Sequence, residues 1–288
     1  MEMYLYEEEV KKLKLKHGAL LSDINNMGIV LTLVTVSLIV SYIVFSFRHF
    51  EGDILLFFFF GLFVIICTDV IIMTLYCESK KRKFFYDEVN KVIINILRSE
   101  LNLELTNTKD MKEYKKELRQ TRVQDGDFIN LYGAFDYQNE DIKGTVYNVI
   151  FSRSNGKTSY ETLRGLVLRF RVESNLNSQI RDDMFAPFKM HKVRDDSTKA
   201  MRLYVPKREE GKYDDTLVGS FNYLKENFNA KSVGIDVNNK EAVIYINYMK
   251  YIPRIKKYDS EDIENYCKMF VNGIEASLKI KEILERNY

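Results

Sequence analysis

Two long apolar segments near the amino end, residues 28–47 and 54–76, constrain this chain more than any other feature. A helix rises about 1.5 Å per residue, so each segment is long enough to cross a hydrocarbon core of about 30 Å. Asp69 is the only charged residue in either segment. The joint over 48–53 has room for a turn only. We therefore expect an antiparallel transmembrane helical hairpin over 28–76.

Basic residues beside the two segments predict the orientation of this hairpin. Lys and Arg close to a span are retained on the cytoplasmic side of a membrane. Lys80, Lys81, Arg82 and Lys83 follow the second segment and several lysines precede the first, whereas the joint holds only Arg48. We expect a multi-pass protein of the inner (plasma) membrane with both termini in the cytoplasm. The cluster of four basic residues could also bind anionic lipid headgroups.

The parts on either side of the hairpin read as helices. The pattern of residues 1–27 predicts an amphipathic arm that lies on the membrane surface or against a partner helix, or that only leads into the membrane, with Gly28 marking a bend. After the second segment, apolar residues recur at steps of three and four through about Leu103. This period predicts that the second membrane helix continues as a juxtamembrane stalk within 77–122, with its apolar stripe packed on the following domain or on a second copy.

The remainder, 123–288, predicts a separate α+β domain. In several segments rich in β-branched and aromatic residues, apolar and polar residues alternate with a period of two, which is typical of half-buried strands. Helical patterns cover 214–228 and the stretch after Ser260. The fold class is therefore α+β, a transmembrane hairpin followed by a mostly antiparallel sheet with flanking helices. The expected strands cover 145–151, 163–172, 200–205, 231–237 and 242–248.

The chain has few of the residue patterns that are typical of catalytic, metal-binding or nucleic-acid-binding sites. The chain has 43 basic and 41 acidic residues, a net charge of +2, so no overall field favours nucleic acid. The three cysteines and three histidines show neither metal-binding spacing nor a nucleophile paired with a base. Adjacent acidic residues border turn signals, where solvated carboxylates are common. We expect no catalytic residue, no metal site and no cofactor, and thus not an enzyme.

Asp69 is the one residue whose position is costly. Ionisable groups within a span usually face protein or water and often serve function. Counted along an antiparallel hairpin, Asp69 lies level with the hydroxyl groups of Thr32, Thr35 and Ser37. We favour a polar clamp that holds the hairpin or an oligomer together, and keep an ion or proton site as the alternative.

Beyond the hairpin and the helix after it, the chain has a characteristic series of short segments at 140–144, 163–165, 188–193 and 196–206. In this order of parts the chain resembles the bacterial membrane proteins grouped as domain of unknown function 3137. The resemblance implies a bacterial inner-membrane protein with a cytoplasmic α+β module, and it brings no catalytic residue.

Two functions remain open at this point. The first is a membrane-anchored, non-enzymatic binding or signalling module whose cytoplasmic domain recognises a protein or small ligand. The alternative is a membrane effector whose hairpins oligomerise into a pore or disrupt the bilayer when the soluble domain is triggered. The expected partners are the lipid bilayer, a second copy of the chain, and a ligand or protein, with no nucleic acid.

Overall fold

The computed structural model describes residues 2–49, 55–101, 103–106, 109–121, 127–182, 190–196, 201–206, 215–238, 240–248 and 260–286. These residues form two compact units. One holds Glu8–Val89, and the other holds Asn90–Tyr288 together with Met1–Glu7.

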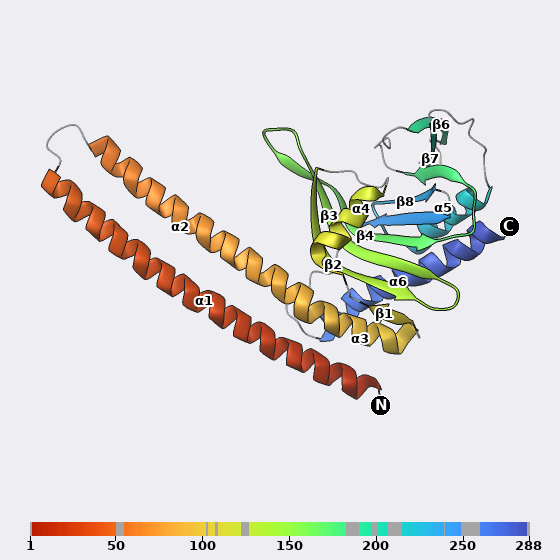
Figure 1. Ribbon diagram of the computed structural model, residues 1–288, viewed down its shortest axis with the longest axis horizontal. Helices are drawn as coiled ribbons and strands as arrows, with labels where there is room; N and C mark the ends of the chain where they lie inside the picture. The colour runs from red at the N-terminus through yellow and green to blue at the C-terminus, as the bar shows by residue number, and fades with distance from the viewer. Residues whose placement is uncertain are drawn as a thin grey trace. The chain divides into compact units, whose positions relative to one another are not determined.

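The first unit is a helical hairpin (Figure 1). Helix α1 (Glu2–His49) runs antiparallel to α2 (Leu55–Phe84). Near one end Lys80 Nζ lies 3.0 Å from Asp23 Oδ2. Toward the other end the Tyr42 phenol packs so closely on Gly61 that a Cβ there would meet its oxygen at 2.3 Å. The antiparallel pairing is as predicted, and residues 50–53 of the predicted turn lie outside the described residues.

Both helices are long and apolar enough to cross a membrane, over Glu8–Phe45 and Phe59–Lys81. The predicted bend at Gly28 is wrong, because α1 continues through this residue without a break. Gly28 instead faces the partner helix, where an added Cβ would lie 3.2 Å from Met73 Cε. The glycine permits close packing of two helices rather than a change of direction. The arm and the first apolar segment are therefore one helix.

Helical structure continues beyond α2, as the sequence predicts. A π-helical turn over Phe85–Val89 leads into α3 (Asn90–Leu101). Asn90 is fully buried, and its side-chain Nδ2 donates a hydrogen bond to the Ala134 carbonyl oxygen at 3.2 Å. Residues of the predicted stalk from Asn90 onward thus belong to the second unit.

The second unit contains an antiparallel sheet with helices on both faces, which confirms the predicted α+β class. Among the described residues the sheet has nine strands in the order β1-β2-β3-β4-β9-β8-β5-β7-β6, and every pairing between neighbours is antiparallel. The strands are β1 (Glu104–Thr106), β2 (Phe128–Gln138), β3 (Lys143–Ser154), β4 (Ser159–Arg171), β5 (Asn177–Arg181), β6 (Met190–Asp196), β7 (Met201–Pro206), β8 (Ser232–Asn238) and β9 (Glu241–Asn247).

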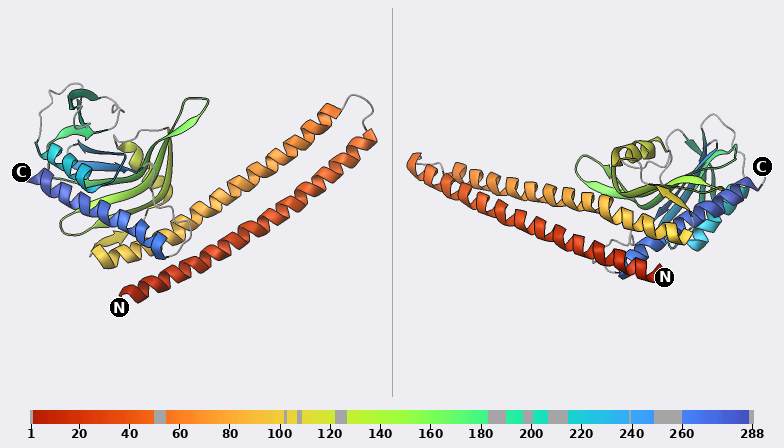
Figure 2. Two further views of the ribbon diagram at one scale, coloured as in Figure 1. Left: turned by 180° about the vertical axis from the view of Figure 1, so that it is seen from behind. Right: turned by 60° about the horizontal axis from the view of Figure 1, so that its bottom comes forward.

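Helices α5 (Asp215–Asn227) and α6 (Ser260–Glu285) cover one face of this sheet (Figure 2). The Phe270 ring of α6 lies 5.2 Å from the Phe135 ring of β2. On the same face Tyr137 donates a hydrogen bond to Ser277 Oγ at 2.9 Å. Because side chains alternate along a strand, the opposite face carries a different set of residues. There α4 (Met111–Gln120) packs Tyr114 edge-on against Tyr147, with ring centroids 6.0 Å apart.

Candidate functional site

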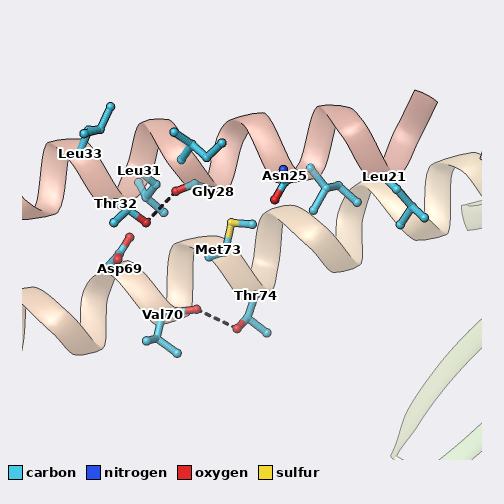
Figure 3. Close-up of a pocket in the computed structure, with 12 residues that line it drawn as sticks. Leu21, Asn25, Gly28, Leu31, Thr32, Leu33, Asp69, Val70, Met73 and Thr74 are labelled. Carbon is cyan, nitrogen blue, oxygen red and sulfur yellow. Dashed lines mark hydrogen bonds between the residues drawn. The ribbon is translucent and has the colours of Figure 1, made fainter. Parts of the chain in front are cut away.

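A groove of 780 Å³ lies between α1 and α2 (Figure 3). Its walls are mostly apolar, as expected for helices that cross a membrane. Asp69 is the only ionisable residue in the lining. The lining residues are Leu21, Ile24, Asn25, Gly28, Ile29, Leu31, Thr32, Leu33, Asp69, Val70, Met73 and Thr74.

Asp69 Oδ1 is buried and has no hydrogen-bond partner. Thr32 lies across from it in the groove, but its hydroxyl donates to the Gly28 carbonyl oxygen at 2.9 Å (Figure 3). Thr35 and Ser37 are not among the groove residues. The structure thus places one of the three predicted hydroxyl groups beside Asp69, and that hydroxyl is used within its own helix.

The basic residues 80–83 after the second segment differ in exposure and pairing. Lys80 pairs with Asp23, and its Nζ lies 5.4 Å from the centroid of the Tyr76 ring. The side chains of Lys81 and Lys83 are exposed. The side chain of Arg82 lies outside the described residues. Lipid headgroups can therefore reach Lys81 and Lys83 without breaking an ion pair that the structure describes.

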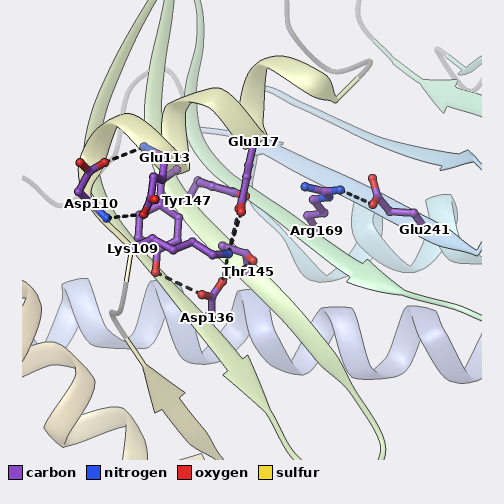
Figure 4. A network of polar contacts seen from close by, with 10 residues as sticks. Lys109, Asp110, Glu113, Glu117, Asp136, Thr145, Tyr147, Arg169 and Glu241 are labelled. Atoms are coloured by element: carbon purple, nitrogen blue, oxygen red, sulfur yellow. Dashed lines mark hydrogen bonds and ion pairs between the residues drawn. The ribbon is translucent and has the colours of Figure 1, made fainter.

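A second set of polar residues ties α4 to the sheet (Figure 4). Lys109 Nζ lies 2.9 Å from Glu117 Oε1 and 3.1 Å from Asp136 Oδ1. Thr145 Oγ1 donates to Asp136 Oδ1 at 2.6 Å. Tyr147 donates its hydroxyl hydrogen to Glu117 Oε2 at 3.2 Å. The lysine precedes α4, and its two acidic partners lie on α4 and on β2, so it bridges the helix and the sheet.

The pKa values of Lys109 and Tyr147 are both shifted in this network. Burial acts to lower the pKa of Lys109, but its hydrogen bonds to Glu117 and Asp136 outweigh this and raise it. Burial, followed by the charge of Glu117, raises the pKa of the Tyr147 phenol. A lysine that keeps its proton and a phenol that stays neutral do not exchange protons with a substrate. The network is better suited to hold α4 than to catalyse proton transfer.

A third polar set lies on the same face of the sheet, where β5 pairs with β8 and β7. Gln179 is fully buried, and neither its Oε1 nor its Nε2 has a hydrogen-bond partner. Its register partners are Asp236 of β8 and Tyr204 of β7, both almost fully buried. Most buried polar side chains in proteins are hydrogen-bonded, so an amide with neither atom paired needs an explanation.

Arg181 belongs to the same polar set and follows Gln179 by two residues on β5. It is 3% exposed, and its guanidinium carbon lies 5.2 Å from the centroid of the Tyr245 ring. Gly234 makes the stacking geometry feasible, because a Cβ there would meet the Tyr245 ring at 2.2 Å. Sequence reasoning missed this set, since the segment Asn177–Arg181 is polar apart from Ile180 and resembles a loop. The term β5 polar set is used below for Gln179, Arg181, Tyr204, Asp236 and Tyr245.

The positions of the cysteines and of His191 do not indicate a further site. Cys267 is buried, and Cys67 and Cys77 are half-buried. His191 lies in β6, and its side chain is outside the described part. Within the described ranges no cluster of three or more His, Cys, Asp or Glu residues could hold a metal ion.

Comparison of the chain with protein-family models, with curated proteins and with solved structures finds no match. The resemblance to domain of unknown function 3137 therefore stays a prediction, and the function has to be inferred from the chain itself.

Proposed function

We propose that this chain is a membrane-anchored, non-enzymatic binding module of the bacterial inner membrane. Its two apolar helices hold it in the bilayer with both termini in the cytoplasm, and its α+β unit recognises a ligand. The resemblance to domain of unknown function 3137 supports the same assignment.

The observation that carries this proposal is the buried amide of Gln179, with both polar atoms unpaired. Leaving a buried donor or acceptor unsatisfied costs about 1–3 kcal/mol. A buried methionine of similar length would avoid that cost. Gln179 is 0% exposed, so a ligand reaches it only when the side chains that cover it move aside. A ligand that then presents one donor beside one acceptor would satisfy both atoms at once. Peptide amides and nucleobase edges have this pattern.

Thermal unfolding of the full chain in detergent, with and without candidate ligands, tests the proposal. Nucleotides and short peptide amides are the probes. A probe at 100 times its Kd should stabilise the protein by about 2.7 kcal/mol. The variant Gln179→Met should unfold at a higher temperature than the wild type without ligand, and should lose the response to the probe.

Gln120→Met, at the exposed end of α4, is the matched control and should change neither property. A Gln179→Met variant less stable than the wild type would show that the amide serves the fold. A wild type that none of these probes stabilises would contradict the assigned ligand chemistry.

The effector function remains the second candidate, because Asp69 has an unpaired buried oxygen in an otherwise apolar hairpin. Assembly of hairpins around such a group is one way to form a polar path through a membrane. Dye leakage from liposomes that contain the wild type or Asp69→Leu tests this function. Equal leakage from both would remove it.

A further inference from the structure

We infer that the groove between α1 and α2 binds the same groove of a second copy of this chain, so that two hairpins form a four-helix bundle in the membrane. In this bundle the two Asp69 carboxyl groups face each other across the two-fold axis. The inference concerns assembly within the membrane and does not depend on the proposed ligand of the α+β unit.

The first argument is the unmet requirement of Asp69. Its Oδ1 is buried without a hydrogen-bond partner. Within a bilayer no water competes for such a group, so a polar atom without a partner is costly. The nearby hydroxyls do not meet this need, because Thr32 donates to the Gly28 carbonyl and Thr74 donates to the Val70 carbonyl at 2.7 Å. No described residue of the hairpin supplies the partner, so we take it to come from outside the hairpin, through the groove that Asp69 lines.

The second argument is the shape and chemistry of the groove surroundings. Three apolar side chains that line the groove stay exposed: Ile29 at 54%, Leu33 at 65% and Val70 at 59%. They flank one polar level, where Asp69 and Thr32 lie (Figure 3). An occupant must therefore be apolar along its length and carry a hydrogen-bonding group at this one depth.

The third argument selects the occupant. Neither apolar segment, 28–47 or 54–76, contains Lys, Arg or His, so a cation from the same chain cannot serve. A two-fold axis along the membrane normal places equal residues of two copies at equal depth. Asp69 of one copy then meets Asp69 of the other, and two carboxyl groups that share a proton supply both donor and acceptor. A lipid chain could fill the apolar part of the groove but offers no donor.

The fourth argument is geometric. Two antiparallel helical hairpins that join their inner faces form a four-helix bundle, with the residues between the helices of each hairpin at its core. Ile29 and Val70 would interdigitate with their counterparts there. Gly28 permits the close approach within each hairpin, since an added Cβ would meet Met73 Cε at 3.2 Å.

Cysteine cross-linking of the full chain in liposomes tests which face is used. The native Cys67 and Cys77 are first replaced by alanine. Ile29→Cys, in the groove, should form a disulfide-linked dimer under mild oxidation. Val34→Cys is the matched control, because it is on the same helix and similarly exposed at 50% but does not line the groove. Equal cross-linking at both positions, or at neither, would overturn the inference.

Single-molecule photobleaching of labelled chains in the same liposomes then tests the role of Asp69. The wild type should bleach in two steps. Asp69→Leu should shift the monomer–dimer equilibrium roughly tenfold toward monomer, which corresponds to loss of an interhelical hydrogen bond in a membrane. Asp69→Asn should keep the dimer, because two carboxamides also pair with each other.

Three results would overturn the inference. A wild type that bleaches in one step would leave the groove to lipid. An Asp69→Leu variant that dimerises like the wild type would remove the carboxyl contact. An Asp69→Asn variant as monomeric as Asp69→Leu would mean that the carboxylate binds a cation or a basic helix of another protein instead.

Discussion

Removing the lysine that bridges α4 and the sheet should loosen α4. In Lys109→Met the apolar stem is kept while both ion pairs, to Glu117 at 2.9 Å and to Asp136 at 3.1 Å, are lost (Figure 4). The three side chains are 22–30% exposed, so solvent screens part of the attraction. A hydrogen bond to a charged group contributes about 1.5–3 kcal/mol, and screening reduces the two bonds together to roughly 2 kcal/mol.

Hydrogen–deuterium exchange of the full chain in detergent measures this effect where it arises. A loss of about 2 kcal/mol corresponds to roughly 30-fold faster exchange of the α4 amides in Lys109→Met. Part of that loss reflects repulsion between the two carboxylates left behind. Adding Glu117→Gln to Lys109→Met should therefore slow the exchange again.

Lys112→Met is the control for this experiment, because Lys112 is exposed on the same helix. Its α4 amides should exchange at the wild-type rate. If Lys109→Met leaves α4 exchange unchanged, the ion pairs contribute nothing to docking of the helix, and the buried Tyr114 and Leu118 together with the hydrogen bond from Tyr147 to Glu117 are sufficient to hold it. If the second substitution accelerates exchange further, the repulsion argument is wrong.

Three further predictions concern the stability of the α+β unit. Gly165→Ala should lower the free energy of unfolding by more than about 3 kcal/mol or prevent folding, because its Cβ would lie 1.9 Å from the Ile246 carbonyl oxygen; circular dichroism of the purified chain would show this. Tyr137→Phe should cost about 0.5–1.5 kcal/mol in urea unfolding, because Ser277 keeps its bond to the Ile274 carbonyl. Hydrogen bonds from Lys279 and Arg286 lower the pKa of Glu282 to about 2. The small stabilising effect of the Glu282 carboxylate should therefore be complete above pH 4.5 and lost as the pH falls toward 2. The urea midpoints of the wild type and of Glu282→Gln should differ above pH 4.5 and converge as the pH approaches 2.

The apolar segments and the strands at the centre of the sheet were readable from sequence because burial selects apolar, β-branched and aromatic residues. The hairpin follows from length and apolarity alone. The strands β3, β4, β8 and β9 combine β-branched and aromatic residues with near-complete burial, so composition and structure agree.

The strands that sequence reasoning missed lack that agreement for identifiable reasons. In β2 a register shift between Leu131 and Gly133 leaves Tyr132 as an extra residue, which breaks the alternation. Strand β1 has only three residues, too few to show a period. In β5 Ile180 is the only apolar residue among four buried ones, because Ser178, Gln179 and Arg181 are polar, so a hydrophobic pattern cannot reveal this strand. Gly28 was misread because a glycine that permits helix packing looks the same in sequence as one that ends a helix.

Asp69 shows which part of a site a sequence can give. Its cost was evident from sequence, and so was its level along the hairpin. The groove beside it depends on how two helices splay, and the use of the Thr32 hydroxyl by Gly28 depends on local geometry. Neither follows from residue order, although the inference that Asp69 pairs with a second copy depends on both.

The two proposals together make signalling through the chain testable, because Asp69 and Gln179 belong to different units. If the α+β unit signals to the hairpin, a ligand that binds near Gln179 must change the dimer equilibrium, and dimerisation must change ligand affinity by the same factor. Photobleaching with and without a stabilising probe measures the first quantity, and probe titration of the wild type and Asp69→Leu measures the second. Equal, non-zero shifts are expected for a signalling module. Ligand affinity that is the same in the wild type and in Asp69→Leu would mean that the hairpin anchors the binding unit without responding to it.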